Sequence, residues 1–290
     1  MTPSDDTFAE HRPLLFTVAY EMLGSAADAE DVLQDSWLRW SQVDDTEVND
    51  PRAYLVRIVT RQALNRLRTV QRQREEYVGT WLPEPLVTAP DVFDDVELAE
   101  SVSFAMLLVL ETLSPLERAV FVLREVFGFE YDEIATMTDR TPAACRQLIA
   151  RARNHVQARR PRYEPPDDVQ RIIAEFFTAA TTGKVEDLMA LMAPDVVLHT
   201  DGGGKKKAAL HPIQGPDKVA RFLFAVTPAD AKIDIDWDVV NGTTALLLYL
   251  DGELDSVVTM TSREGLVDDI YFVRNPDKLA GIGTRRDVSR

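Results

Sequence analysis

The stretch from residue 140 to residue 162 carries side chains that can read duplex DNA. It contains seven arginines and no Asp or Glu, although the chain of 290 residues has a formal net charge of -16. In the major groove, Arg can form two hydrogen bonds to guanine and Gln can form two to adenine, while small residues let a helix approach closely. The expected DNA-facing side chains are Ala143, Arg146, Gln147, Ala150, Arg151 and Arg153. Phosphate contacts are expected from Arg151, Arg159 and Arg160.

A second basic row follows Asp50 and Pro51, a pair typical of a helix start. No Asp or Glu occurs from there to Glu75, and at the helical period the arginines lie opposite an apolar row. Guanidinium groups that follow phosphates, with a ring that stacks on an unpaired base, suit single-stranded nucleic acid. The alternative is an exposed helix face kept soluble by arginine. The members of the row are Tyr54, Arg57, Arg61, Asn65, Arg68 and Arg72.

A further helix is expected over residues 28 to 40. Its apolar positions, which include Trp37, form one face that is expected to be buried. Another face carries an acidic row with one exposed leucine. Spacing alone allows this row to be either a solvated surface or a surface that binds a partner. The row consists of Asp31, Gln34, Asp35 and Leu38.

The elements around the basic stretch indicate a helix-turn-helix. Ser114 and Pro115 mark the start of one helix, a short helix is expected over residues 131 to 137, and Thr141 with Pro142 begins the next. The single cysteine lies on the expected inward seam of that last helix, where it should pack as a small apolar side chain. The alternative is a plain helical hairpin with a basic exterior.

Composition argues against several kinds of site. With one cysteine and four scattered histidines, we expect no disulfide framework, no metal site and no cofactor. The first residues are acidic, and no uninterrupted apolar run reaches the roughly 18 residues that a membrane helix needs. We therefore expect a cytoplasmic protein without a membrane partner.

Residue usage and proline-rich stretches divide the chain. The first 162 residues contain eighteen Arg and no Lys, whereas the remaining residues contain seven of each. Stretches rich in proline and acidic residues are expected to act as linkers. The expected segments are a helical domain over residues 1–75, a linker over 76–99, a second helical domain over 100–160, a linker over 161–167 and a C-terminal domain over 168–290.

The C-terminal segment combines helices with a strand meander. Helices come first, and the alternation in KIDIDWDVV then predicts a half-buried strand with Ile235 and Trp237 facing inward. Asn241 and Gly242 predict a hairpin turn directly after it. Helices followed by a meander indicate an α+β domain.

The N-terminal patterns together resemble the extracytoplasmic-function sigma factors of bacterial RNA polymerase. DAEDVLQDSWLRW is similar to that family's clamp-binding helix, DPRAYLVRIVTRQALNRLR to its -10 helix, and LSPLERAVFVLREVFGFEYDEIATMTDRTPAACRQLIARAR to its -35 domain. The resemblance implies that the acidic row binds core RNA polymerase, and that the Tyr54 row and the 143–153 surface read the two elements of promoter DNA. It thus implies an alternative sigma factor that directs promoter-specific transcription initiation.

The C-terminal segment resembles a SnoaL-like domain of the nuclear transport factor 2-like superfamily, a cone of curved sheet closed by helices. The motifs WLPEP (81–85), DGGGK (201–205) and NPDKL (275–279) resemble those of SigJ-type sigma factors, in which this domain docks on the sigma domains and regulates them in cis. The implied fold has two all-α sigma domains followed by an α+β domain. The implied regulatory contacts are Trp81, Leu82, Pro83, Asp201, Gly202, Gly203, Gly204, Lys205, Asn275, Pro276, Asp277, Lys278 and Leu279.

Two other functions compete with this one. A ligand-responsive helix-turn-helix regulator with a sensor domain would leave the acidic row and the Tyr54 row without a role. An enzyme could use His199, Asp201 and His211 as acid and base groups, but it would explain only the last third of the chain. The cone also leaves room for a small ligand of unknown identity, and the DGGGK loop could be an ordinary flexible turn.

Overall fold

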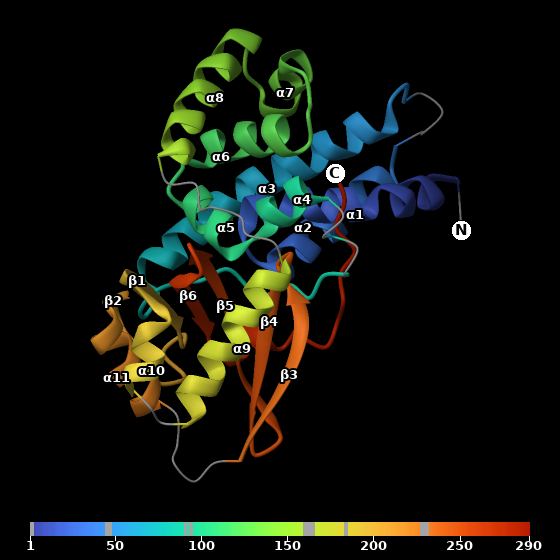
Figure 1. Ribbon diagram of the computed structural model, residues 1–290. Helices are drawn as coiled ribbons and strands as arrows, with labels where there is room; N and C mark the ends of the chain where they lie inside the picture. The colour runs from blue at the N-terminus through green and yellow to red at the C-terminus, as the bar shows by residue number, and fades with distance from the viewer. Residues whose placement is uncertain are drawn as a thin grey trace.

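The N-terminal residues form three helices that pack together (Figure 1). The structure, a computed structural model, describes residues 3–43, 48–89, 92, 95–158, 166–182, 185–226 and 232–290. The helices are α1 (Pro3–Leu23), α2 (Ala26–Trp40) and α3 (Pro51–Glu75). The Ser25 hydroxyl caps α2 by accepting a hydrogen bond from Asp28 N, and the Asp50 carboxylate accepts one from Ala53 N at the start of α3. The expected helix start at Asp50 and Pro51 is confirmed.

A second group of helices contains the expected helix-turn-helix. It consists of α4 (Val96–Val102), α5 (Phe104–Glu111), α6 (Pro115–Phe121), a π-helical turn η3 (Val122–Val126), α7 (Tyr131–Thr138) and α8 (Pro142–Gln157). Ser114 and Glu117 form a capping box at the start of α6. Thr141 caps α8, and Asp139 takes a left-handed backbone conformation, φ 54°, in the turn before it. The expected order of helix, turn and helix is therefore confirmed.

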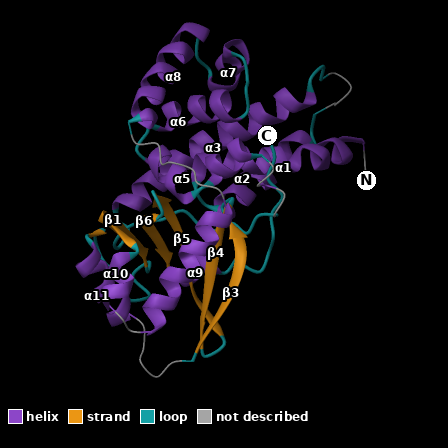
Figure 2. Ribbon diagram, viewed as in Figure 1, coloured by secondary structure: helices purple, strands orange, loops and turns teal. Residues whose placement is uncertain are grey.

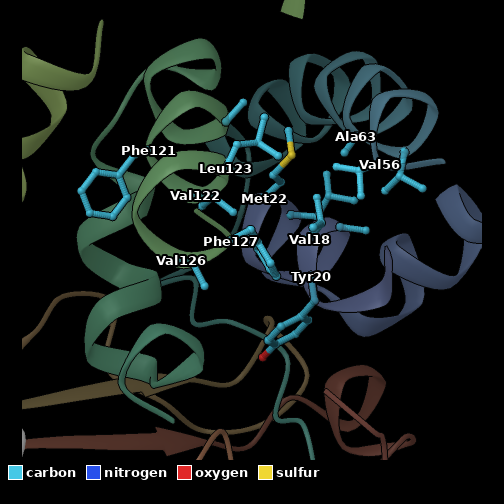
Figure 3. Packing of buried hydrophobic residues seen from close by; sticks show 14 of the residues in the cluster. Val18, Tyr20, Met22, Val56, Ala63, Phe121, Val122, Leu123, Val126 and Phe127 are labelled. Carbon is cyan, nitrogen blue, oxygen red and sulfur yellow. The ribbon is translucent and has the colours of Figure 1, made fainter. Parts of the chain in front are cut away.

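One hydrophobic core joins the two groups of helices. Val18 and Met22 of α1 belong to the same buried cluster as Val56 of α3, Leu123 of η3 and Phe127, and Figure 3 shows these side chains packed together. Burying an apolar side chain of this size stabilises a fold by about 1.5–3 kcal/mol. Separating the two groups would therefore expose an apolar surface that is costly to hydrate.

The C-terminal part is an α+β domain built on one sheet (Figure 2). Its strands run in the order β2-β1-β6-β5-β4-β3, with β1 parallel to β6 and the other neighbours antiparallel. The strands are β1 (Met192–Asp201), β2 (Ile213–Gln214), β3 (Ile233–Val240), β4 (Thr243–Leu250), β5 (Glu253–Arg263) and β6 (Leu266–Val273), and the helices are α9 (Pro166–Thr182), α10 (Val185–Ala190), α11 (Pro216–Val226) and α12 (Pro276–Leu279). The expected fold class is confirmed.

The two faces of the sheet are buried by different parts of the chain. Because side chains alternate between faces along a strand, Leu246 packs with α9 to α11 in one core. Its neighbour Leu247 lies in a second core, which also contains Tyr271 of β6 and Phe104 of α5. The Phe104 and Tyr271 rings stack with their centroids 5.9 Å apart. The helical half of the chain thus covers the second face of the sheet.

The expected β3–β4 hairpin turn is confirmed. Asn241 and Gly242 both have positive φ, 54° and 65°, as a tight hairpin requires. Ile235 and Trp237 pair with core residues of β4 and so lie on the predicted face of the sheet, but they are less buried than expected, at 39% and 37% exposed. The reason is that β3 is an edge strand of the sheet, so only one neighbouring strand flanks these side chains.

Candidate functional site

The acidic row lies on the exposed face of α2. Asp31, Gln34, Asp35 and Leu38 are all exposed, as the spacing predicted. The prediction that Trp37 is buried is wrong, because its side chain is 40% exposed. It lines a cleft of about 430 Å³ between α1 and α2, together with Phe8 and Leu33. Sequence reasoning missed this tryptophan because the helical period placed it with the buried face.

The Tyr54 row on α3 is exposed at one end and partly covered at the other. Asn65, Arg68 and Arg72 are exposed, whereas Tyr54, Arg57 and Arg61 are half-buried. The Arg57 guanidinium lies 4.6 Å from the centre of the Tyr54 ring, and that ring also packs against Trp40 at 5.7 Å. One end of the row is therefore accessible to a ligand, whereas the other end contacts neighbouring side chains of the protein.

Arg61 joins this row to the helix-turn-helix. Its Nη2 atom donates hydrogen bonds to Thr136 O at 3.0 Å and to Asp139 Oδ1 at 2.6 Å, and its Nε atom donates one to Met137 O at 3.3 Å. All three acceptors belong to α7 and the turn before α8. A cleft of about 340 Å³ lies between Tyr54 and this part of α7. The structure therefore holds the two groups of candidate DNA-binding residues close together.

The predicted reading face of α8 points outward. Cys145 is buried on the opposite side of the helix with Ile149, Ala152 and Val156. Two of the basic side chains already have acidic neighbours: Arg151 pairs with Glu117 at 3.1 Å and Arg153 with Glu125 at 2.7 Å. The exposed residues of this face are Ala143, Arg146, Gln147, Ala150, Arg151 and Arg153. Arg159 and Arg160, further candidates for phosphate contacts, lie outside the described residues.

The motifs WLPEP, DGGGK and NPDKL come together around Trp81. The Arg74 guanidinium lies 3.5 Å from the centre of the Trp81 ring and Lys278 Nζ lies 4.3 Å from it. Arg74 lies in the last turn of α3, whereas Lys278 belongs to α12. The aromatic ring thus lies against two cations, one from each half of the chain, and cation–π attraction stabilises both contacts. We call Arg74, Trp81 and Lys278 the tryptophan clamp.

Asp201 anchors the tryptophan clamp from the DGGGK loop. Its buried carboxylate accepts hydrogen bonds from Tyr77 Oη at 2.6 Å, from Leu82 N at 2.9 Å and from Lys278 Nζ at 2.7 Å. Burial lowers the pKa of Lys278 to about 8, although the Asp201 charge opposes this shift. Gly203 N donates to the same carboxylate at 3.0 Å.

The glycines of the loop are needed for its close packing. A Cβ on Gly203, whose φ is 58°, would lie 2.3 Å from the Asn275 amide nitrogen, and one on Gly202 would lie 2.2 Å from Lys206 O. Lys205 pairs with Asp277 at 2.6 Å. These contacts favour a loop held in one conformation over an ordinary flexible turn.

The remaining predicted contact residues lie in or beside this cluster. Leu82, Pro83, Gly202, Asn275 and Leu279 are buried, whereas Gly204, Lys205, Pro276 and Asp277 are exposed. Sequence reasoning missed Arg74 and its partner Glu111, which pairs with both Arg74 and Arg118. The one signal for Arg74 was that the run without acid in α3 ends at this arginine, close to the start of the linker.

Comparison with known proteins identifies the family. Sigma-70 region 2 matches residues 7–73, Sigma-70 region 4 matches residues 103–156, and the SnoaL-like domain matches residues 173–270. The chain is 36% identical over 289 residues to the ECF RNA polymerase sigma factor SigJ of Mycobacterium tuberculosis (strain ATCC 25618 / H37Rv), covering 94% of this chain and 92% of that protein. The chain belongs to the ECF RNA polymerase sigma factors.

Two further comparisons agree with this family. The crystal structure of Mycobacterium tuberculosis extracytoplasmic function sigma factor SigJ matches with a TM-score of 0.73 at 34% identity, covering 94% of this chain and 96% of that one. The ECF RNA polymerase sigma factor SigG of Mycobacterium tuberculosis (strain CDC 1551 / Oshkosh) is 30% identical over 219 residues, 64% of this chain and 58% of that protein. The expected alternative sigma factor is confirmed, and the ligand-responsive regulator is not favoured.

Two of the three groups that an enzyme would need have other partners in this sigma factor. Asp201 is occupied by the contacts around the tryptophan clamp, and His199 pairs with Asp269 at 3.0 Å while stacking on Tyr271. His211 is exposed. Among the described residues, no group of three or more His, Cys, Asp or Glu side chains is placed to hold a metal ion. Within the same residues, no helix is both long and apolar enough to cross a membrane.

Proposed function

We propose that this sigma factor binds core RNA polymerase through the row on α2 and reads promoter DNA through α3 and α8. The exposure of Leu38 among acidic side chains supports a protein partner for α2. Exposed Arg68 and Arg72 suit an unpaired -10 strand. Arg146 and Gln147 suit the base edges of a duplex -35 element. Because transcription initiation takes place on the chromosome, we place this sigma factor in the cytoplasm.

The C-terminal SnoaL-like domain regulates the sigma domains in cis, without catalysis. It does so by holding them in an arrangement in which Arg61 keeps α3 against the turn before α8, which we call the closed arrangement. The tryptophan clamp carries this proposal, because Lys278 of the SnoaL-like domain and Arg74 of α3 lie against the same ring. Arg74 is on the helix that bears the Tyr54 row. A change in the docking of the C-terminal domain is therefore transmitted through the Trp81 contacts to α3, the helix proposed to read the -10 element.

The closed arrangement has to open before promoter DNA is bound. The two promoter elements are separate sites on the duplex, whereas Arg61 holds α3 against the turn before α8. A partner shifts such an equilibrium only through its preference for one state, and core polymerase is the partner that would favour the open one. Because exposed charges are screened beyond about 8 Å, the local basic rows can then bind DNA despite a net charge of -16.

Transcription with full-length variants tests this proposal. Lys278→Met removes the charge that contacts both Trp81 and Asp201, so we expect several-fold more transcript from a responsive promoter in a purified assay with core polymerase. Lys218→Met changes an exposed lysine of α11 and serves as the control. Parental output from Lys278→Met would contradict cis regulation. No transcript from any candidate promoter, including the gene's own, would contradict promoter-specific initiation by this chain.

A further inference from the structure

The tip of the β3–β4 hairpin is buried, although hairpin tips are ordinarily in water. Asn241 is 0% exposed, and its hydrogen-bond partners lie outside the SnoaL-like domain. Its Oδ1 atom accepts from Leu86 N at 2.9 Å, and its Nδ2 atom donates to Tyr20 Oη at 2.5 Å and to Val102 O at 2.8 Å. Its backbone N donates to Leu86 O at 2.8 Å.

The socket for Asn241 is assembled from three separate segments. Tyr20 belongs to α1, Leu86 to the linker, and Val102 ends α4, directly before the region 4 match. Figure 3 shows Tyr20 turned away from the other labelled core side chains. Its hydroxyl accepts from Asn241 and donates to Glu84 O at 2.8 Å. One side chain therefore connects region 2, the linker and the start of region 4.

The amide of Asn241 matches this socket in both hydrogen-bonding groups. Its two donor hydrogens meet two oxygens, and its acceptor oxygen meets an N–H. A buried amide is costly unless such partners are present. The contact is therefore favourable only while Tyr20, Leu86 and Val102 keep their present relative positions.

Gly242 makes the fit specific to this hairpin. A Cβ at this position would lie 2.7 Å from Ala99 O, whereas a Cβ on Gly252, in the next hairpin of the same sheet, would meet nothing within 4 Å. Thr88 N also donates to Val239 O at 2.9 Å, beside the tip. Both hairpins have a glycine at this position of the turn. The turn conformation therefore does not explain the close approach at Gly242, whereas docking against Ala99 does.

The hairpin tip and the tryptophan clamp hold the linker at two points. Asp201 and Lys278 contact the linker at Tyr77, Trp81 and Leu82. The hairpin tip contacts it again at Leu86 and Thr88. We propose that Asn241 and Gly242, which belong to none of the three motifs, form a second docking site through which the SnoaL-like domain recognises the closed arrangement of the sigma domains. This inference rests on the proposed cis regulation. It adds Asn241 as the residue whose hydrogen bonds depend on how the sigma domains and the linker are placed.

Hydrogen–deuterium exchange on the full chain tests the docking site. Asn241→Asp keeps the shape and suits the turn, but it replaces both donors by an acceptor. Asn241→Gly removes the side chain and still allows positive φ. We expect either change to raise amide exchange over residues 82–88 and 99–103 by about tenfold or more, as local opening becomes easier, while β5 and β6 stay protected. Asp251→Gly, at the matching position of the exposed hairpin, should leave these rates at the parental level.

The outcomes separate this inference from the proposed regulation. Parental exchange in the linker of both Asn241 variants would overturn the docking site, whatever the transcription result. If the same variants and Lys278→Met all loosen the linker but leave transcription unchanged, the docking site stands and cis regulation fails. If both Asn241 variants loosen the linker and raise transcription with core polymerase several-fold, both are supported.

Discussion

At the scale of single residues, the closed arrangement contains an acid held out of water. Glu21 of α1 is fully buried, and its Oε1 atom accepts a hydrogen bond from Ser101 Oγ at 2.6 Å. Its Oε2 atom has no hydrogen-bond partner among the described residues. Burial raises the pKa of Glu21 to about 8, against the opposing effects of Ser101 and of the Arg118 charge.

Glu21→Gln should therefore remove a pH dependence of stability. A folded-state pKa above the unfolded value means that the folded protein binds more protons between about pH 4.5 and pH 8. The stabilising contribution of Glu21 is complete below that window and is lost as the pH rises through about 8. In urea unfolding on both sides of the window, we expect the free energy of unfolding of the parent to fall relative to the variant as the pH rises. Parallel profiles would contradict the raised pKa.

At the scale of elements, the linker supports the helix that is proposed to bind polymerase. Glu84 of WLPEP accepts hydrogen bonds from Ala27 N at 3.2 Å and from Ser25 Oγ at 3.0 Å, at the start of α2. A carboxylate at a helix N-terminus satisfies free backbone N–H groups and interacts favourably with the helix dipole. The same linker thus contacts the SnoaL-like domain and caps α2.

Glu84→Ala should loosen the first turn of α2. Loss of a cap of this kind costs about 1 kcal/mol, so we expect faster amide exchange over residues 26–29 and weaker binding to core polymerase. Glu76→Ala removes an exposed glutamate from the same linker and is the control. Unchanged exchange in Glu84→Ala would show that Ser25 alone is sufficient to cap the helix.

At the scale of the whole molecule, charged and aromatic contacts connect all three family domains. Arg118 of region 4 pairs with Glu111, which pairs with Arg74 in the last turn of α3, the helix that ends region 2. Arg74 lies on Trp81, and Lys278 of the SnoaL-like domain contacts the same ring. Since these groups are largely buried, removing one leaves its partner without compensation. We therefore expect docking of the C-terminal domain to be coupled to the contact between the sigma domains.

Helix caps and tight turns were predictable from the sequence. Ser114, Thr141 and the Asn241–Gly242 turn were identified because caps and tight turns depend on neighbouring residues. The socket for Asn241 was not predictable, because Asn241 and Tyr20 are 221 positions apart. Trp37 was assigned to the wrong environment because periodicity gives the face of a helix but not how far that face is covered.

The distance between α3 and α8 in solution shows whether the closed arrangement opens for promoter binding. Spin labels on Thr69→Cys of α3 and Gln157→Cys of α8 report on this distance, because both positions are exposed and lie outside the proposed DNA-binding rows. A Cys145→Ala background removes the native cysteine. We predict one short distance in the free chain, a longer one with core polymerase and promoter DNA, and a partial shift to the longer distance in free Lys278→Met. The same distance in the free chain and in the promoter complex would contradict a closed arrangement that opens for function.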